Sequence, residues 1–597
     1  MLILTEKPSV AKDFAKALGC SFSSAEKCFK SADGSIYITN CVGHLFQLEE
    51  PAFYNQSFKS WKKLPVIPDQ FHYHVTAELK DAAKVVVGLL KKLKNDEILI
   101  ATDADREGEI IARECLKAAG ITDYSKIKRF WVSQALTSAV IKDGIAKAKA
   151  LGNYNLLAEQ GFSRQHSDWL VGINGTRFIT NKAGSLFTVG RVQTAVLSAI
   201  SERCRNIKDF VPEKYYEIYG EFNPPAGIKI KGVLCDSAVK TKLKDTALVD
   251  ELKRYVTSPA KCLELKSEKK EILPPQLYSL NDLQKDAFRY FNYSAEETLK
   301  LVQKLYEDYK CVSYPRTPSK VMGSQNVQLC SDLYQKFLTQ YLEYFVLHPF
   351  YKVDASNKRI FNDSQLEAHH AIIPLEKLPV GASGDEENIY NLILERFMLA
   401  FAPVHVYEKQ TAKLGVGNYQ FKVEGRKVLD EGWQKFRRFT RLLKEKDSDT
   451  EEVQVLDSID WNNLTLGSVD SVQKTTKPPK HFNEASILAF MENPKGESDD
   501  KKLAGLGTPA TRHTFIPKLL RLNYIEVQNK NIQITKTGEK LLSLVKETPL
   551  SAIADVSETT RWEEKLAQNP AEFESEIKDF IRSSIKGGQN ELSDFPL

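Results

Sequence analysis

The clearest hydrophobic pattern in the chain is a run of four apolar residues at 98–101, Ile-Leu-Ile-Ala, followed by an acidic stretch. A run without gaps is typical of a strand buried on both faces, because it would cover the whole circumference of a helix. After Gly108 the apolar positions become Ile111, Cys115 and Ala118, at helical spacing, and Gly120 is placed to end the helix. The pattern predicts strand, acidic turn and helix in that order.

The start of the chain repeats this arrangement. Residues 2–4 read as a strand, and Val10, Phe14, Ala17 and Leu18 follow at helical spacing before Gly19. We expect Ser9 to cap that helix. Further strands at 35–38 and 128–132 and a helix at 81–93 complete the alternation. The first 150 residues are therefore predicted to form an α/β domain with a parallel sheet.

The pattern changes three times after this region. Residues 152–205 are mostly helical, whereas 213–271 and 404–472 contain short alternating segments that suggest strands of one discontinuous β-rich domain. The stretch between them is helical and includes a capping-box sequence at 294–297, Ser-Ala-Glu-Glu. After a basic, proline-rich linker at 474–480, Thr508 and Pro509 begin a helix that precedes a predicted hairpin. This last order suggests a winged-helix unit.

Composition changes this picture little. A chain of 597 residues with 42% hydrophobic residues should form several globular domains, and a net charge of +5 neither requires nor excludes a nucleic-acid partner. Nine cysteines without a Cys-x-x-Cys pair give no support to a zinc ribbon or a disulfide framework. No leader pattern or long apolar run occurs, so we expect a cytoplasmic protein without a membrane partner.

Candidate chemistry begins at the acidic turn. Asp103, Asp105 and Glu107 would repel one another unless a hard cation such as Mg²⁺ neutralised them, and the carboxyl ends of parallel strands are where ligands bind. Glu6 and Lys7 follow the first strand and should reach the same edge. Two alternatives remain open: a calcium loop, which the strand-like residues before Asp103 disfavour, and a solvated charge cluster.

Tyr314 and Arg316 form a second candidate pair. Each of residues 314 and 317 precedes a proline, which favours an extended backbone, and residues two apart in such a backbone face the same way. A phenol is a poor nucleophile unless a cation or a base activates it, and Arg316 is the nearest cation. The alternative is a rigid turn, since most of the 23 tyrosines must serve packing.

Other candidates are weaker by themselves. His369 and His370 adjoin an apolar run, and neighbouring residues point in different directions, so we expect at most one of them to face a site. Arg164 and Asp168 lie one helical turn apart, and arginines on such helices usually form a solvated face. The predicted winged helix offers candidate phosphate contacts at Arg512, His513, Lys518 and Arg521.

Taken together, these segments resemble the type IA DNA topoisomerases, of the bacterial topoisomerase III kind. The resemblance is carried by short motifs in order over nearly the whole chain: Leu-Thr-Glu-Lys-Pro-Ser at 4–9, Val-Gly-His-Leu at 42–45, Thr-Asp-Ala-Asp-Arg-Glu-Gly-Glu at 102–109, Asp-Trp-Leu-Val-Gly at 168–172, Gly-Arg-Val-Gln-Thr at 190–194, Leu-Asn-Asp-Leu-Gln at 280–284, Ser-Tyr-Pro-Arg-Thr at 313–317, His-His-Ala-Ile-Ile-Pro at 369–374 and Gly-Thr-Pro-Ala-Thr-Arg at 507–512.

The resemblance implies a multidomain fold: a Rossmann-like Toprim domain, a β-rich arch and two winged-helix-like helical domains that enclose a central hole. The expected boundaries are 1–152 for Toprim, 153–212 with 473–597 for a DNA-binding helical domain, 213–272 with 404–472 for the arch, and 273–403 for the domain with the tyrosine. The Cys-rich carboxyl-terminal region of many topoisomerase I relatives has no counterpart here.

It also implies the chemistry. Tyr314 would attack a phosphodiester of single-stranded DNA, forming a 5′-phosphotyrosyl link that a free 3′-OH later reseals, without ATP. Arg316, Lys7 and His369 would act at the phosphate, and Glu6 at the 3′ oxygen. Mg²⁺ would be held by Asp103, Asp105 and Glu107, with Glu6 alongside. Expected DNA contacts are Arg164, Arg191, Gln193, His370 and Arg512.

Relaxation of negative supercoils and decatenation are both expected outcomes of this reaction. The expected setting is the nucleoid, with the chain acting as a monomer beside a helicase or a single-strand-binding protein. Two alternatives are another Toprim enzyme, such as a primase or nuclease, and a non-catalytic single-stranded DNA-binding protein. Neither has a use for the Tyr-Pro-Arg sequence at 314–316.

Overall fold

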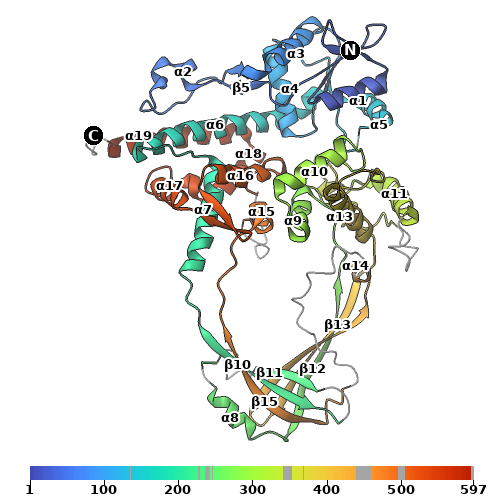
Figure 1. Cartoon of the computed structure of the whole chain (residues 1–597), viewed down its shortest axis with the longest axis vertical. Helices are drawn as coiled ribbons and strands as arrows, with labels where there is room; N and C mark the ends of the chain where they lie inside the picture. The colour runs from blue at the N-terminus through green and yellow to red at the C-terminus, as the bar shows by residue number, and fades with distance from the viewer. Residues whose placement is uncertain are drawn as a thin grey trace.

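The structure is a computed structural model that describes residues 1–134, 136–225, 229–235, 243–244, 246–340, 353–366, 369–437, 459–494 and 505–592. The chain forms four parts: one lies at the top of Figure 1, two lie side by side below it, and the fourth lies at the bottom. We call them the N-terminal lobe (1–154), the helical body (155–208 with 482–592), the tyrosine block (273–403) and the barrel (214–272 with 405–475). Two of these parts are assembled from segments far apart in the sequence.

The N-terminal lobe is built on a seven-stranded sheet in the order β2-β3-β4-β1-β7-β8-β9. Its centre is parallel, since β1 pairs with β4 on one side and β7 on the other, and β7 pairs with β8. The strands are β1 Leu2–Thr5, β2 Ser21–Ser23, β3 Cys28–Lys30, β4 Tyr37–Asn40, β7 Ile98–Ala101, β8 Ile127–Arg129 and β9 Lys149–Ala150. The predicted α/β domain with a parallel core is confirmed.

Helices cover both faces of this sheet, which explains the uninterrupted apolar run at 98–101. Leu99 of β7 faces α1 (Pro8–Leu18) and α5 (Ser138–Ala146), whereas Ile98 and Ile100 face α3 (Lys80–Lys92) and α4 (Arg106–Ala118). The strand before the acidic turn excludes the calcium-loop alternative, which needs a helix there. Ser9 is not the cap of α1: Lys7 occupies that position and Pro8 is the first helical residue.

The helical body joins two distant segments around one hydrophobic core. Its first segment supplies α6 (Asn155–Ala183) and α7 (Arg191–Lys208). Its second supplies α15 Glu484–Glu492, α16 Pro509–Arg521, α17 Lys536–Lys546, α18 Val556–Gln568 and α19 Pro570–Leu592. Between α16 and α17 lies the hairpin of β16 (Ile525–Gln528) and β17 (Asn531–Ile534). Helix followed by hairpin is the predicted winged-helix order.

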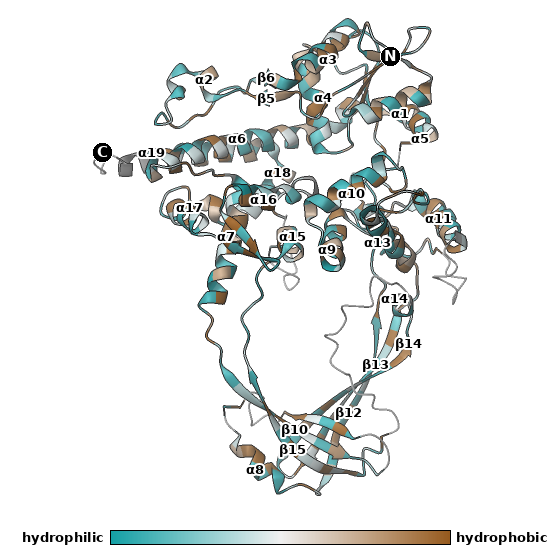
Figure 2. Cartoon of the chain, in the orientation of Figure 1, coloured by the Kyte–Doolittle hydropathy of each residue, from teal (hydrophilic) through white to brown (hydrophobic). Residues whose placement is uncertain are grey.

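The barrel is closed by six strands in the order β10-β11-β14-β13-β12-β15. They are β10 Lys214–Asn223, β11 Ile230–Leu234, β12 Pro259–Ile272, β13 His405–Val416, β14 Tyr419–Asp430 and β15 Leu464–Thr475. Hydrophobic and hydrophilic residues interleave along these strands (Figure 2). Inward residues such as Phe222, Phe421 and Leu466 form the barrel core, with α8 (Ala247–Lys253) packed against it. The predicted β-rich domain is therefore a single barrel.

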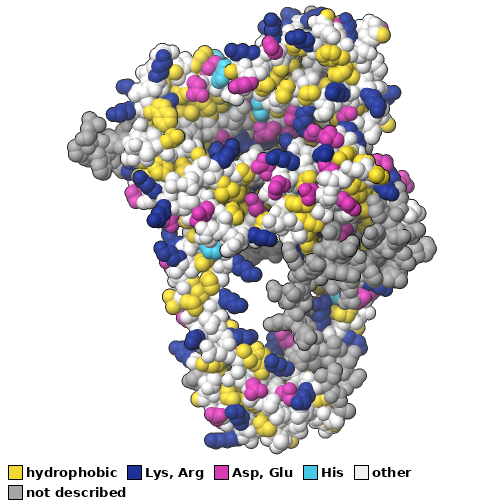
Figure 3. All heavy atoms as spheres, in the orientation of Figure 1, with side chains coloured by type: hydrophobic (Ala, Val, Ile, Leu, Met, Phe, Trp, Pro, Cys, Tyr) yellow, Lys and Arg dark blue, Asp and Glu magenta, His cyan; other side chains and the backbone are white. Residues whose placement is uncertain are grey.

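The tyrosine block contains α9 Leu280–Phe291, α10 Ala295–Glu307, α11 Val327–Gln340 and α13 Gly384–Ala400 around its own core. The predicted capping box at Ser294 is formed at the start of α10. Between the barrel and the helical parts the molecule encloses an opening, which the space-filling view shows passing through it (Figure 3). None of the helices in the described ranges is long and apolar enough to cross a membrane.

Candidate active site

The carboxyl ends of β1 and β7 bring Glu6 to the acidic turn. The two strands pair in parallel with Thr5 opposite Ala101, so the residues after each strand meet at one edge of the sheet. Glu6 Oε2 accepts a hydrogen bond from the Asp103 backbone N–H at 3.1 Å. The prediction that one sheet places Glu6 beside the acidic residues is confirmed.

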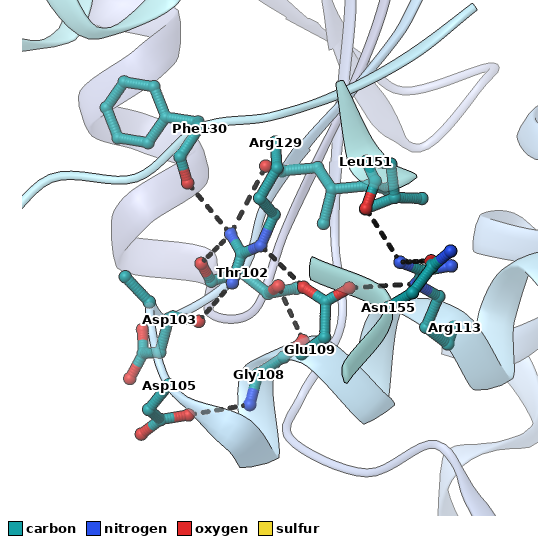
Figure 4. A network of polar contacts seen from close by, with 12 residues as sticks. Thr102, Asp103, Asp105, Gly108, Glu109, Arg113, Arg129, Phe130, Leu151 and Asn155 are labelled. Carbon is teal, nitrogen blue, oxygen red and sulfur yellow. Dashed lines mark hydrogen bonds and ion pairs between the residues drawn. The ribbon is translucent and has the colours of Figure 1, made fainter. Parts of the chain in front are cut away.

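A buried ion-pair network fixes the shape of the acidic turn (Figure 4). Arg129, fully buried on β8, donates to Glu109 Oε2 at 2.9 Å and to the carbonyl oxygens of Thr102 at 2.8 Å and Asp103 at 2.5 Å. Arg113 donates to the other oxygen of Glu109 at 2.9 Å. Because a buried ion pair is stable only when its lone pairs are satisfied, this network holds the turn rigidly.

The start of α4 also shapes the turn. Asp105 caps the helix, its Oδ1 accepting the Gly108 N–H at 2.8 Å. A β-carbon on Gly108 would lie 2.1 Å from the Asp103 carbonyl oxygen, so only glycine permits the close approach. The cap leaves Asp105 Oδ2 directed away from the helix.

Tyr314 reaches the turn from the tyrosine block. Its backbone N–H donates to the Ser133 carbonyl oxygen at 3.0 Å, and its hydroxyl donates to Asp105 Oδ2 at 3.0 Å. The ring is 4% exposed and lies edge-on against Tyr306. Burial first, and then the charges of Asp105 and Asp103, raise the pKa of the Tyr314 hydroxyl well above its usual value. In this arrangement the phenol is protonated and hydrogen-bonded to a carboxylate.

His369 holds the tyrosine against the turn. Its ring lies 4.3 Å from the Tyr314 ring, centroid to centroid, and Nε2 contacts the Ala104 carbonyl oxygen. A carbonyl can only accept, so Nε2 carries the proton, and a neutral Nδ1 accepts the Ser133 hydroxyl at 2.8 Å. Burial lowers the pKa of His369 to about 4, which keeps the ring neutral at physiological pH.

Two cations border the same turn. Lys7 Nζ lies 3.0 Å from Asp103 Oδ2 and 2.8 Å from Glu307 Oε1 at the end of α10. The buried Nε of Arg316 has no hydrogen-bond partner among the described residues. Burial opposes the charge of Arg316, but Tyr314, Asp103 and Asp105 raise its pKa. As predicted, residues 314 and 316 face the same cluster.

The carboxylates compete for protons at this edge. Burial, together with the charges of Asp103 and Asp105, raises the pKa of Glu6 to about 8. Burial and Asp103 also raise the pKa of Asp105. A bound divalent cation would remove this repulsion, and carboxylate oxygens are its usual ligands. Glu6, Asp103 and Asp105 therefore have the donor chemistry for such an ion, although their described side chains are not gathered into a ready-made site in this structure.

Glu107 does not belong to that set. It lies in the first turn of α4, where Arg164 Nη1 donates to it at 3.0 Å and His44 Nε2 lies 3.5 Å away. Burial alone would raise the pKa of Glu107, but His44 and Arg164 bring it to about 2. Among the described residues no three His, Cys, Asp or Glu side chains form a ready-made metal site. The expected triad of Asp103, Asp105 and Glu107 is therefore not assembled, because Glu107 is held on the side of Arg164 and His44.

A groove of about 560 Å³ opens on that side, between the N-terminal lobe and α6. It is lined by His44, Glu107, Arg164 and Trp169, among others. Glu114 and Glu107 bond His44 and, against the effect of burial, raise its pKa to about 10. The groove thus begins beside the acidic turn and carries both charged and apolar walls.

The residues predicted to bind DNA divide into two groups. Arg164 lines the groove. Four others are buried in this structure, and contact between them and DNA stays a prediction. Arg191 donates to Asp168 at 2.8 Å and to Glu563 at 2.6 Å; the remaining three are Gln193 at 2% exposure, His370 at 5% and Arg512 at 8%.

Several site residues lack an individual signal in the sequence. Ser133 is an exception: it follows the predicted strand at 128–132, so the strand pattern predicts that it lies at the carboxyl edge of the sheet. His44 and Glu109 lie within motifs but have no role that local spacing reveals. Glu307, the partner of Lys7, ends an ordinary amphipathic helix. Tertiary packing alone brings it to the site.

Comparison with known proteins gives consistent matches. The family model described as "DNA topoisomerase" matches residues 153–572, and the Toprim domain model matches residues 1–135. DNA topoisomerase 3 of Bacillus licheniformis is 32% identical over 98% of this chain and 81% of its own, and that of Bacillus cereus strain ZK is 35% identical with the same coverage. The solved structure of full-length topoisomerase I from Thermotoga maritima matches with a TM-score of 0.72 at 22% identity, covering 98% of this chain and 90% of that one.

Proposed function

The chain belongs to the type IA DNA topoisomerase family and is an ATP-independent DNA topoisomerase, and from this premise we propose that Tyr314 is its nucleophile. In the proposed reaction, Tyr314 Oη attacks the phosphorus of a phosphodiester in single-stranded DNA. The bond from phosphorus to the 3′ oxygen breaks, and a 5′-phosphotyrosyl link forms. The observation that supports this most directly is the 3.0 Å hydrogen bond from Tyr314 to Asp105 across two parts of the molecule.

The phenolic proton has an acceptor in place. Asp105 Oδ2 already accepts the Tyr314 hydroxyl, and its raised pKa suits it to hold the proton as the new bond forms. The neutral His369 ring, fixed by Ser133 and the Ala104 carbonyl, keeps the phenol in position. His369 thus acts as a positioning residue in this proposal, and it does not need to carry charge.

The leaving oxygen needs a proton, and Glu6 is suited to supply it. A carboxyl group with a pKa of about 8 is protonated at neutral pH, and it can take the proton back from the 3′-OH when the strand is resealed. The guanidinium group of Arg316, whose buried Nε has no partner among the described residues, and the ammonium group of Lys7 would stabilise charge on the phosphate in the transition state. The energy of the broken bond stays in the phosphotyrosine, so ATP is not required.

Toprim domains of topoisomerases generally bind a divalent metal, and we propose Mg²⁺ here. Asp103 and Asp105 would hold it, joined by Glu6 once Glu6 has given up its proton, and when bound it would supply positive charge for resealing. The groove along α6 would hold the single strand next to the site, with Arg164 as a backbone contact. The bacterial relatives support the rest of the proposal. The protein would relax and decatenate DNA as a monomer in the cytoplasm, at the nucleoid, and would act with a helicase or a single-strand-binding protein.

The test is direct. Single-stranded DNA labelled on either end is incubated with the protein and Mg²⁺, denatured, and examined for label attached to protein. We expect attachment through the 5′ end of the break, and none with Tyr314→Phe, while DNA binding persists. Tyr309→Phe is the matched control, because the Tyr309 hydroxyl contacts Glu386 within the same block. Attachment by Tyr314→Phe, or a 3′ link, would refute the proposal.

A further inference from the structure

Aromatic side chains lie beyond the end of the groove, along the C-terminal half of α6. β5 (Phe46–Leu48) lines the groove, and the chain runs from it into α2 (Pro51–Tyr54), which projects over α6 (Figure 1). Tyr54 lies edge-on to the groove residue Trp169, with ring centroids 6.1 Å apart. The aromatic cluster is therefore continuous with the groove.

Two of these aromatic side chains are exposed to solvent. Phe53 is 55% exposed and Trp61 is 41% exposed, although each also contacts the protein. Phe53 packs edge-on against Tyr54, and the Arg177 guanidinium lies 5.6 Å from the Trp61 ring. One face of each ring system is thus supported and part of it remains open.

The backbone from Phe58 to Val66, which carries Trp61 and follows Phe53, is anchored to α6. Asn174 both donates to and accepts from the Val66 backbone, at 2.9 and 2.7 Å. Asn181 donates to the Trp61 carbonyl oxygen at 2.9 Å, and Arg177 donates to that of Phe58 at 2.8 Å. A segment held in this way presents its exposed rings in fixed positions, which reduces the entropy lost on binding.

Positive charge accompanies the rings. Lys59, Lys62 and Lys63 are all exposed in the same segment. Fixed aromatic faces interleaved with basic side chains are the combination that binds single-stranded nucleic acid, because bases stack on the rings while lysines attract the phosphates. An apolar protein partner would be a poorer fit to a surface with three lysines around two rings.

We propose that Phe53 and Trp61, with the lysines between and beside them, form a stacking platform for single-stranded DNA that extends the groove. The proposal rests on the proposed function. From Arg164 to Asn181, α6 rises about 25 Å, so the platform would hold nucleotides well outside the active site. We refer to these side chains as the stacking platform.

The chemistry of the break says which side of the strand the platform holds. After cleavage the 5′-phosphate fragment is retained covalently on Tyr314, in the tyrosine block. The fragment ending in the 3′-OH has no covalent link, so non-covalent contacts must keep it, and the groove between the N-terminal lobe and α6 offers them beside the site. The stacking platform would bind the DNA on the 5′ side of the break and so prevent loss of this fragment while the gate is open.

The test uses fluorescently labelled strands that carry one cleavage site, with a constant arm on its 3′ side. The arm on the 5′ side is either short, about 3 nucleotides, so that it cannot reach the platform, or long, about 20 nucleotides, so that it spans the extended site. Binding is measured in the Tyr314→Phe background, where no cleavage occurs. We expect Trp61→Ala or Phe53→Ala to weaken binding of the long strand about tenfold and of the short strand less than twofold.

Further variants separate stacking from a structural effect. Trp61→Phe retains an aromatic face and should bind nearly as wild type, whereas Trp61→Leu should bind like Trp61→Ala. Phe22→Ala is the matched control, because Phe22 is 58% exposed on β2, in a different part of the lobe. Equal binding of the long strand by wild type, Trp61→Ala and Phe53→Ala would refute the stacking platform. The exposed surface would then be one that binds a protein partner.

The two proposals fail in different ways. If wild-type protein forms no 5′-linked product on either strand, the proposed function is wrong whatever the binding data show. If product forms normally but the long arm gives no advantage that Trp61→Ala removes, only the stacking platform is wrong. Trp61→Ala should also release more of the 3′-OH fragment, but only from long strands. The released fraction is measured as cleaved DNA that does not reseal when salt is added.

Discussion

The N-terminal lobe makes two contacts with the rest of the molecule, and they differ in kind. Against the helical body it shares a hydrophobic core: Phe71, with Leu48 and Leu64 beside it, packs among Leu170 and Phe178 of α6. Against the tyrosine block the described contacts are mainly hydrogen bonds and ion pairs, including Tyr314 to Asp105 and Lys310 to Asp13, together with the stacking of Trp131 on His369. The core of the tyrosine block includes no described residue of the lobe.

This difference determines where the molecule can open. Separating the lobe from the body would expose apolar surface to water, at a free-energy cost of about 25 cal/mol for each Å² exposed. Separating it from the tyrosine block exchanges polar contacts for water, at a net cost of about 0.5–1.5 kcal/mol for each hydrogen bond. The break in the DNA is proposed at the second contact. Strand passage into the opening of Figure 3 would therefore use the contact that is cheaper to break.

The largest effect is expected from a substitution that removes part of the apolar contact between the lobe and the body. Phe71→Ala deletes a ring that is 5% exposed and stacked on His166 at 4.0 Å, so it should lower the free energy of unfolding by about 3–5 kcal/mol. Chemical denaturation followed by tryptophan fluorescence measures this. Phe22→Ala is the control, and its effect should stay within about 0.5 kcal/mol. Comparable losses in the two variants would show that the lobe and body do not depend on this shared core.

The next effect concerns chemistry at the polar contact and should leave the apolar one intact. Arg316→Ala should slow cleavage of single-stranded DNA about 10²–10³-fold, because it removes donors aimed at developing negative charge. Arg316→Lys should recover part of the rate. Single-turnover cleavage measures both, with Arg289→Ala on α9 as the control. A rate within twofold of wild type would remove Arg316 from the mechanism.

A third effect is a pH dependence of stability in the metal-free protein. The pKa of Glu6 is about 8 in the folded state against a usual 4.5, so folding favours its protonated form. That stability is complete below pH 4.5 and is lost as the pH rises through 8.

The measurement compares unfolding of wild type and Glu6→Gln from pH 5 to 9 in a chelator. The difference between the two should grow as the pH rises, with Glu6→Gln the more stable at high pH. Added Mg²⁺ should reduce the difference at pH 9. A difference that does not change with pH would show that Glu6 titrates normally.

The smallest effect tests the polar contact itself. Lys310→Ala removes the ion pair with Asp13, which lies between the two parts but outside the catalytic cluster. Because both side chains are partly exposed, we expect the closed state to lose about 0.5–1 kcal/mol, giving a two- to fivefold shorter closed time. Single-molecule extension measurements under force report that time. Lys300→Ala, whose partner Glu296 is on the same helix, should leave it unchanged.

Much of the fold follows from local patterns. The run at 98–101, the alternation at 419–423 and the capping box at Ser294 each specify their element, because burial on two faces, burial on one face and helix capping leave distinct sequence signatures. Ser9 was wrong as a cap because Pro8 already occupies the first helical position. The motifs identified the family, and with it the tyrosine and the acidic turn.

The sequence by itself determined the elements, the family and the residues capable of the chemistry. Only the tertiary structure decided which of them act together. It placed Tyr314 on Asp105, directed Glu107 away to Arg164, and buried Arg191 against Glu563. The physical reason is that these contacts join residues 57 to 372 positions apart, and no local periodicity encodes the direction of a side chain across such a distance.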